Sequence, residues 1–141
     1  MKRVFSAFLL CAVLLSCCVG AFAATEAVER ASDILRTYSA RVATGTNSGE
    51  VKISYSAIEG NTVSSIGASS IAIYKSDGTY VTTIYGSPNN GMIARNTSIK
   101  NGSYTYKGTS GVSYYAKVNI AAVANGETEV RTVITNTVRA K

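Results

Sequence analysis

The chain has no histidine and no tryptophan among its 141 residues, and its single proline is Pro88. Cysteine and phenylalanine occur only in the first 22 residues, so the remainder has no thiol. A Ser-His-Asp or Cys-His catalytic unit therefore cannot be assembled there, and neither can a zinc site with histidine and cysteine ligands. A Gly-rich phosphate loop is also missing from the sequence. We expect neither a cofactor nor a metal.

Residues 1–23 have the layout of a secretory signal peptide. Lys2 and Arg3 precede an apolar run, Val4–Val19, which is followed by the small-x-small sequence that ends at Ala23. We predict cleavage after Ala23 and a secreted, extracellular protein that has no membrane contact after cleavage.

Two alternatives to cleavage after Ala23 stay open. One is a retained membrane anchor, although the apolar run is shorter than the ~20 residues of a typical membrane span. The other is lipidation at Cys17, because Leu14-Leu15-Ser16-Cys17 loosely resembles a bacterial lipobox.

The charge of the chain is mildly basic. Without the leader it keeps 12 basic and 8 acidic residues, a net charge of +4. Such a charge is compatible with simple solubility or with contact to an anionic cell-wall polymer, and it is too small to indicate a nucleic acid partner. The expected partner is an extracellular protein, a glycan or a cell-wall polymer of unknown identity.

The composition beyond the leader is typical of a β protein. Valine, isoleucine, threonine and tyrosine are abundant, and Leu35 is the only leucine. We predict an irregular or short helical lead-in over 24–35 (with Glu26–Arg36 as its helical pattern) and a β domain over 36–141. The clearest strand is Glu50–Ile58, in which apolar and polar residues alternate. About seven short strands predict an all-β, antiparallel two-sheet sandwich of the immunoglobulin or fibronectin-III kind.

The first predicted hairpin is closed by Asp77-Gly78, a dipeptide that favours a two-residue turn with positive φ at both positions. Its register pairs Tyr74 with Val81, Ile73 with Thr82 and Ile71 with Ile84. The following stretch, Gly86–Lys100, is predicted to be a long connection that Met92 and Ile93 anchor to the core, and Ser103–Lys107 to be a strand.

The last predicted hairpin contains Asn125-Gly126. A two-residue turn there would pair Ile120 with Arg131 and turn Val130 and Ile134 away from the core. A one-residue change of register reverses every side chain of a strand. We therefore predict a three-residue loop, Asn125–Glu127, which pairs Ile120 with Thr132.

The predicted ligand-binding surface consists of Tyr74, Val81 and Tyr85. In the predicted register these residues lie on the face opposite Ile71, Ile73 and Ile84, and tyrosine combines a rigid ring with a polar tip that suits recognition. The alternative is that they pack beneath the Gly86–Lys100 connection.

The alternating segment that begins at Tyr114, Tyr-x-Ala-x-Val-x-Ile-x-Ala, resembles the sixth strand of fibronectin-III modules. The resemblance implies a structural tyrosine corner, in which the Tyr114 hydroxyl binds back to the preceding turn.

Three segments resemble a family of small exported proteins of clostridial, Gram-positive gut bacteria that is classed as a domain of unknown function. They are Ile66–Ile71, the Gly86–Asn96 loop, and Tyr106–Gly111 with the strand that follows it. The resemblance covers about Ser32 to Val138 and implies a bacterial, exported, single-domain protein. It implies no catalytic residue.

Carboxylates are the one remaining route to catalysis. Glu127 and Glu129 are two residues apart near a turn, a spacing that a glycosidase or a calcium site could use. The alternative is a solvated hairpin end whose charges discourage edge pairing. We therefore expect a non-enzymatic extracellular binding module, with a small carboxylate-dependent hydrolase or lyase and a self-assembling surface or matrix subunit as the alternatives.

Overall fold

A computed structural model describes residues 34–141, which lie within the compact unit Ser32–Lys141. The predicted leader, the cleavage site after Ala23 and the alternative lipidation site at Cys17 lie outside the described residues. So does most of the predicted lead-in, of which Ile34 and Leu35 are buried in irregular backbone.

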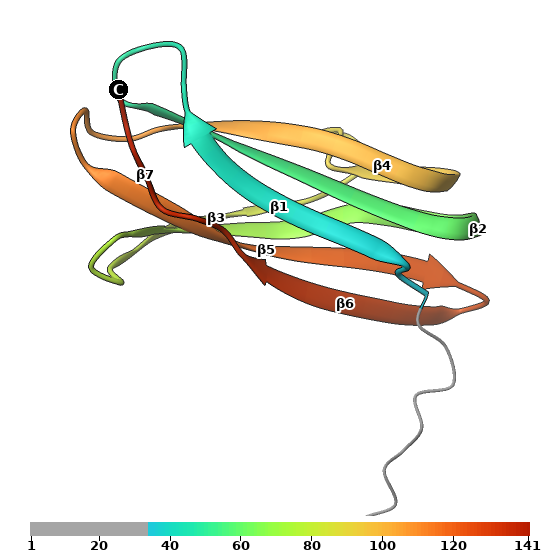
Figure 1. Cartoon of the computed structure of the whole chain (residues 1–141). Coiled ribbons are helices and arrows are strands. Elements are labelled where there is room, and N and C mark those ends of the chain that lie inside the picture. The colour runs from blue at the N-terminus through green and yellow to red at the C-terminus, as the bar shows by residue number, and fades with distance from the viewer. Residues whose placement is uncertain (1–33) are drawn as a thin grey trace, which may run out of the picture. The chain divides into compact units, whose positions relative to one another are not determined.

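The described part of the chain forms one antiparallel sheet (Figure 1). This confirms the prediction of an all-β, antiparallel fold with about seven strands. The strands are β1 (Thr37–Thr44), β2 (Glu50–Lys75), β3 (Tyr80–Tyr85), β4 (Ile93–Lys107), β5 (Ser113–Ala124), β6 (Glu127–Ile134) and β7 (Val138–Arg139).

The sheet is organised by β2, which is 26 residues long. Its first half pairs with β1 along one edge and with β4 along the other. Its second half pairs with β5 along the first edge and with β4 and then β3 along the second. The pairing with β4 shifts register between Ile58 and Val63, where β2 bends. All strands therefore belong to a single hydrogen-bonded sheet that curls into a half-barrel, whereas we expected two separate sheets.

Two predicted breaks in the strands are wrong. Residues 59–68, which separate the predicted strand Glu50–Ile58 from the first predicted hairpin, continue β2. Strand β4 begins at Ile93, so that the predicted connection Gly86–Lys100 shrinks to residues 86–92. The polar and glycine-containing stretches suggested loops, but β2 regains backbone partners after its bend, on β4 from Val63 and on β5 from Ser65. Met92 is buried, as predicted. Its carbonyl oxygen comes so close to Gly67 that a Cβ atom at this position would lie 2.2 Å away from it.

The core fills the concave side of the curled sheet. The predicted inward face of Glu50–Ile58 is confirmed, since Val51, Ile53, Tyr55 and Ala57 are all buried. Branched aliphatic side chains from the second half of β2 and from β5 complete it, and the largest of those that are fully buried are Ile66, Ile71, Ile73, Val118 and Ile120.

The turn after β2 differs from the predicted one. The N–H of Gly78 donates to the Lys75 carbonyl and the N–H of Lys75 donates to the Thr79 carbonyl, each at 2.9 Å. Only Gly78 has a positive φ, because the Asp77 carboxylate accepts a hydrogen bond from the Thr79 N–H at 2.8 Å and stabilises the ordinary conformation. The loop is therefore one residue longer than predicted, with glycine in the bulge position.

The turn between β5 and β6 is also not the predicted one. Asn125 and Gly126 both have positive φ, 53° and 82°, and close a two-residue turn. Ile120 pairs with Arg131, so the predicted pairing of Ile120 with Thr132 is wrong. The dipeptide suits the left-handed conformation at both positions, and this local preference decided the register.

The register of β6 exposes two apolar residues. Val130 and Ile134 are 51% and 64% exposed, while Glu129 pairs with the buried Ala122 and takes the inward direction. The prediction assumed that the aliphatic residues of β6 face the core. Instead β6 is an edge strand that turns Glu129, Arg131 and Val133 inward.

Along residues 34–141 there is no helix long and apolar enough to cross a membrane.

Gly102 of β4 makes room for the buried ring of Tyr55 on β2. The two residues are cross-strand partners, and the Tyr55 hydroxyl donates to the Met92 carbonyl at 3.3 Å. Burial raises the pKa of Tyr55. A Cβ atom on Gly102 would lie 2.2 Å from the Tyr55 hydroxyl oxygen and 2.4 Å from the ring carbon that bears it.

We predict that Gly102→Ala lowers the free energy of unfolding by about 1 to 3 kcal/mol, because the ring must move and give up its hydrogen bond to Met92. Urea unfolding measures the change. The control is Ser103→Ala on the exposed side of the same strand, which should change stability by less than about 0.5 kcal/mol. Equal stability of the two variants would contradict the proposed role of Gly102.

Candidate functional site

The observed turn separates the three residues of the predicted binding surface. Tyr74 pairs with Tyr80 instead of Val81, because β3 carries the irregularity that follows the longer loop. Val81 consequently packs against the core, and the predicted pairing of Tyr74 with Val81 is wrong. Tyr85 is 76% exposed. The two other predicted pairs, Ile73 with Thr82 and Ile71 with Ile84, are confirmed.

Tyr74 belongs to a group of aromatic side chains on the convex face of the sheet. Its ring stacks on Tyr115 of β5, with centroids 5.2 Å apart and planes 14° apart. Tyr80 of β3 meets the same ring edge-on at 5.7 Å. The Nζ atom of Lys117 lies 4.9 Å from the Tyr74 centroid. We call Tyr74, Tyr80, Tyr115 and Lys117 the tyrosine cluster.

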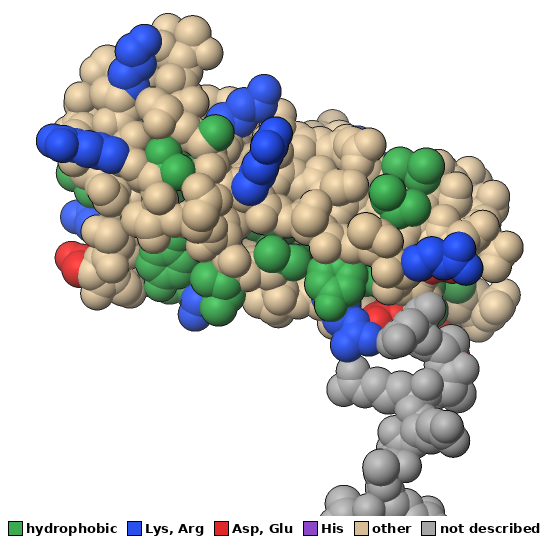
Figure 2. All heavy atoms as spheres, viewed as in Figure 1, with side chains coloured by type: hydrophobic (Ala, Val, Ile, Leu, Met, Phe, Trp, Pro, Cys, Tyr) green, Lys and Arg blue, Asp and Glu red, His purple; other side chains and the backbone are tan. Residues whose placement is uncertain are grey.

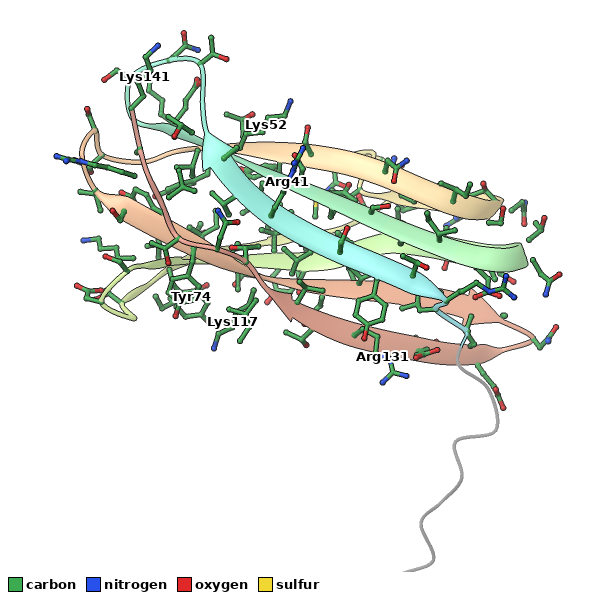
Figure 3. All side chains as sticks on the ribbon, in the orientation of Figure 1. Arg41, Lys52, Tyr74, Lys117, Arg131 and Lys141 are labelled. Atoms are coloured by element: carbon green, nitrogen blue, oxygen red, sulfur yellow. The ribbon has the colours of Figure 1, made fainter. Side chains whose placement is uncertain are left out.

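Strand alternation explains why the tyrosine cluster faces outward. Ala116 and Val118 of β5 are fully buried, so Tyr115 and Lys117 point to the opposite side of that strand. Tyr74 is likewise next to the buried Ile73. Figure 3 shows Tyr74 and Lys117 together on the outside of the sheet, on the side away from Arg41 and Lys52.

Sequence reasoning missed Tyr80, Tyr115 and Lys117. The outward direction of Tyr115 and Lys117 was implied by the buried face predicted for their strand, which starts at Tyr114. Their proximity to Tyr74 depends on the pairing of β5 with the second half of β2, and no local pattern in either strand indicates that pairing.

A polar ladder lies beside the tyrosine cluster on the same face. The Thr132 hydroxyl donates to the Asn119 side-chain oxygen at 2.7 Å, and the Asn119 amide donates to the Ser70 hydroxyl at 2.9 Å. These bonds cross from β6 through β5 to β2. Tyr85, which pairs with Ser70, and Ile134, which pairs with Lys117, extend the exposed surface on either side.

Tyr114 is part of the fold and does not line an exposed surface. Its side chain is buried, and its hydroxyl accepts a hydrogen bond from the Thr109 N–H at 2.9 Å. The ring packs edge-on against Tyr106 at 5.5 Å. The hydrogen bond links the start of β5 to the turn that precedes it.

The two candidate carboxylates have different surroundings. Glu129 accepts hydrogen bonds from the backbone N–H groups of Ile34 and Leu35, and it forms an ion pair with Arg131. Burial tends to raise the pKa of Glu129, but the two N–H groups and the guanidinium outweigh it and lower that pKa. Glu127 is exposed at the hairpin end. Glu129 therefore serves as a bridge between β6 and the segment before β1, and the hydrolase or lyase reading stays a prediction.

A second side-chain bridge joins the same two edges. The side chain of Asn136 accepts from the Val42 N–H at 3.0 Å and donates to the Val42 carbonyl at 2.9 Å. Among residues 34–141, β1 and β6 share no backbone hydrogen bond. Glu129 and Asn136 thus hold together two strand edges that have no ladder between them.

Within residues 34–141, no group of three or more acidic side chains lies close enough together to hold a metal ion.

Comparison of the chain with protein-family models, with curated proteins and with solved structures finds no match in any of the three.

We predict that Glu129→Gln destabilises the protein by about 1 to 3 kcal/mol at pH 7, because two backbone N–H groups lose a charged acceptor. The lowered pKa of Glu129 sets the pH dependence. The stability that the ionised Glu129 carboxylate contributes is fully present above the unfolded-state pKa, about 4.3. It is lost as the pH falls through the lower folded-state pKa. The difference between the native protein and the variant should therefore shrink in acid.

Urea unfolding between pH 7 and pH 3 tests this dependence. Asn136→Ala is the matched control, since it removes the other bridge with a group that does not titrate. The loss of unfolding free energy in Asn136→Ala should stay constant over the same pH range. A Glu129→Gln effect that is equally independent of pH would contradict the role of the carboxylate.

Proposed function

We propose that the chain is an exported, non-enzymatic binding module and that the tyrosine cluster is its contact surface. The observation that carries this proposal is the assembly of three tyrosines and one lysine on the convex face, where they contribute nothing to the core. Rigid aromatic side chains with polar tips supply contact area at a small entropic cost. The leader predicted over 1–23 accounts for export to the extracellular medium.

The proposed partner is an extracellular protein with acidic groups at its contact surface. A sugar stacks best on an open aromatic face, but Tyr115 and Lys117 both lie over the ring of Tyr74. Ring edges, hydroxyl groups and the Lys117 ammonium remain available, and these suit hydrogen-bond acceptors and carboxylates of a protein. The exposed Tyr80, at 57%, and the neighbouring Tyr85 extend this surface.

We further propose that the module has the same kind of binding role as the immunoglobulin-like and fibronectin-III-like modules of extracellular proteins. The two arms of the curled sheet cover one core, as the two sheets of those modules do. The resemblance to exported clostridial proteins implies an exported, single-domain protein, which is compatible with this role. We do not propose a nucleic acid partner.

Self-assembly is the second candidate, and one feature of β4 supports it. This 15-residue strand pairs only with β2 among the described residues, so its other edge offers unpaired backbone groups. However, Arg95, Lys100 and Lys107 lie along the strand, and basic side chains are a common protection against edge-to-edge pairing. We therefore place the binding module first.

We predict that replacing Tyr74 and Tyr80 together by alanine weakens capture of the partner by at least about tenfold, because both aromatic contacts are lost. The immobilised protein would be exposed to bacterial culture medium and to intestinal mucus. The bound proteins would then be quantified by mass spectrometry. Tyr38→Ala on β1 is the control and should leave capture unchanged. Capture of the same proteins at the same level by the double variant would contradict the proposal.

A further inference from the structure

A shallow depression of about 420 Å³ lies on the other convex arm of the sheet, over β1, β4 and the first half of β2. Two cross-strand rows form it. In one row Arg41 pairs with Ser54, and in the other Ser39 pairs with Ser56, which pairs in turn with Asn101. Alternation turns these side chains outward, because the residues between them on β2 are buried.

Small side chains make the hollow. Ser39, Ser54 and Ser56 stand among longer neighbours, while Gly102 lines the depression with its backbone only. Lys52 lies in the next row beyond Arg41. At the opposite end, the next cross-strand row after Ser56 and Asn101 contains Ile99, which is 49% exposed. The depression is thus bounded by basic side chains at one end and by an aliphatic side chain at the other.

The basic end of the depression is not neutralised. Among residues 34–141 the ion pair of Arg131 with Glu129 does not involve it, and neither Arg41 nor Lys52 pairs with an acidic group of that range. Glu50, the nearest acidic residue on the same strand, is engaged by the backbone and side-chain N–H groups of Asn47 at 3.0 and 2.9 Å. Figure 3 shows Arg41 and Lys52 side by side, and in the same view Figure 2 shows basic side chains and no acidic one over that part of the surface.

We propose that this depression binds a polyhydroxylated polymer that carries carboxylate or phosphate groups. Serine hydroxyls and the Asn101 amide both donate and accept hydrogen bonds, as the hydroxyl groups of a sugar or polyol require. The Arg41 guanidinium matches a carboxylate or a phosphate in a two-pronged fashion, and Lys52 adds a second positive charge. The site is separate from the tyrosine cluster, which lies on the convex face of the other arm.

Isothermal titration calorimetry of the purified protein at 150 mM salt tests the proposal. The probes would be polygalacturonate for the carboxylate source, polyglycerol phosphate for the phosphate source and dextran as the neutral polymer. We expect binding to one or both acidic polymers and none to dextran. The acidic polymer that binds identifies the source of the anionic group.

The variants locate the site. Arg41→Gln should weaken binding at least on the order of tenfold, and Arg41→Lys less, because it keeps the charge without the planar fork. Ser56→Tyr should abolish binding because the tyrosine ring fills the depression. Strands accommodate tyrosine well, so the variant should still fold. Arg95→Gln removes an equal charge from an exposed position on β4 that does not line the depression, and Tyr74→Ala tests the other surface. Both should bind like the native protein.

Failure of both acidic polymers to bind would overturn the proposal. So would equal losses in Arg41→Gln and Arg95→Gln, which would reflect net charge alone, or equal binding of dextran. None of these outcomes bears on the capture of a protein by the tyrosine cluster, so the two proposals fail independently.

Discussion

The structure depends on one constraint, which is that both edges of the 26-residue strand β2 must be paired along a path that bends. A flat sheet could not bury both halves of this strand against each other. The bend between Ile58 and Val63 brings β1 and β4 to one arm and β5 and β3 to the other, and the isoleucine-rich inner faces of the two arms meet. Strand β4 pairs with β2 on both sides of the bend. Both the continuous chain of β2 and its hydrogen bonds to β4 therefore connect the two arms on that side.

On the opposite side of the half-barrel, β1 and β6 share no backbone ladder within residues 34–141, and side chains join them instead. Glu129 accepts from two N–H groups before β1, and Asn136 satisfies both backbone groups of Val42. The Glu129 contacts depend on the two-residue turn at Asn125-Gly126, because its register directs Glu129 inward. The same register leaves Val130 and Ile134 on the outside. One turn therefore sets both the closure of the fold and the character of its convex face.

The two convex faces differ because their side chains differ in size. On the arm formed by β5 and the second half of β2, large rings and Lys117 contact each other across strands and build a raised aromatic surface. On the other arm, three small serine side chains leave a hollow beside Arg41. Neither set of residues is required to fill the core, since the inward positions of the same strands do that. The proposed functions follow from this division.

The sequence alone determined the all-β class, the inward face of Glu50–Ile58 and the outward direction of Tyr74, because alternation is a local property that each strand carries in its own residues. It predicted the register of the first hairpin correctly at Ile71 and Ile73 but not the turn that closes it, and it did not determine the register of the second hairpin. Asp77 kept its ordinary conformation through a hydrogen bond to Thr79, and Asn125 adopted a left-handed one against the apolar pattern of β6. Nor did the sequence indicate that Tyr115 and Lys117 lie against Tyr74, or that Arg41 borders a row of serines. Those neighbours come from strands distant in the chain, and only the pairing of β2 with all of its partners places them side by side.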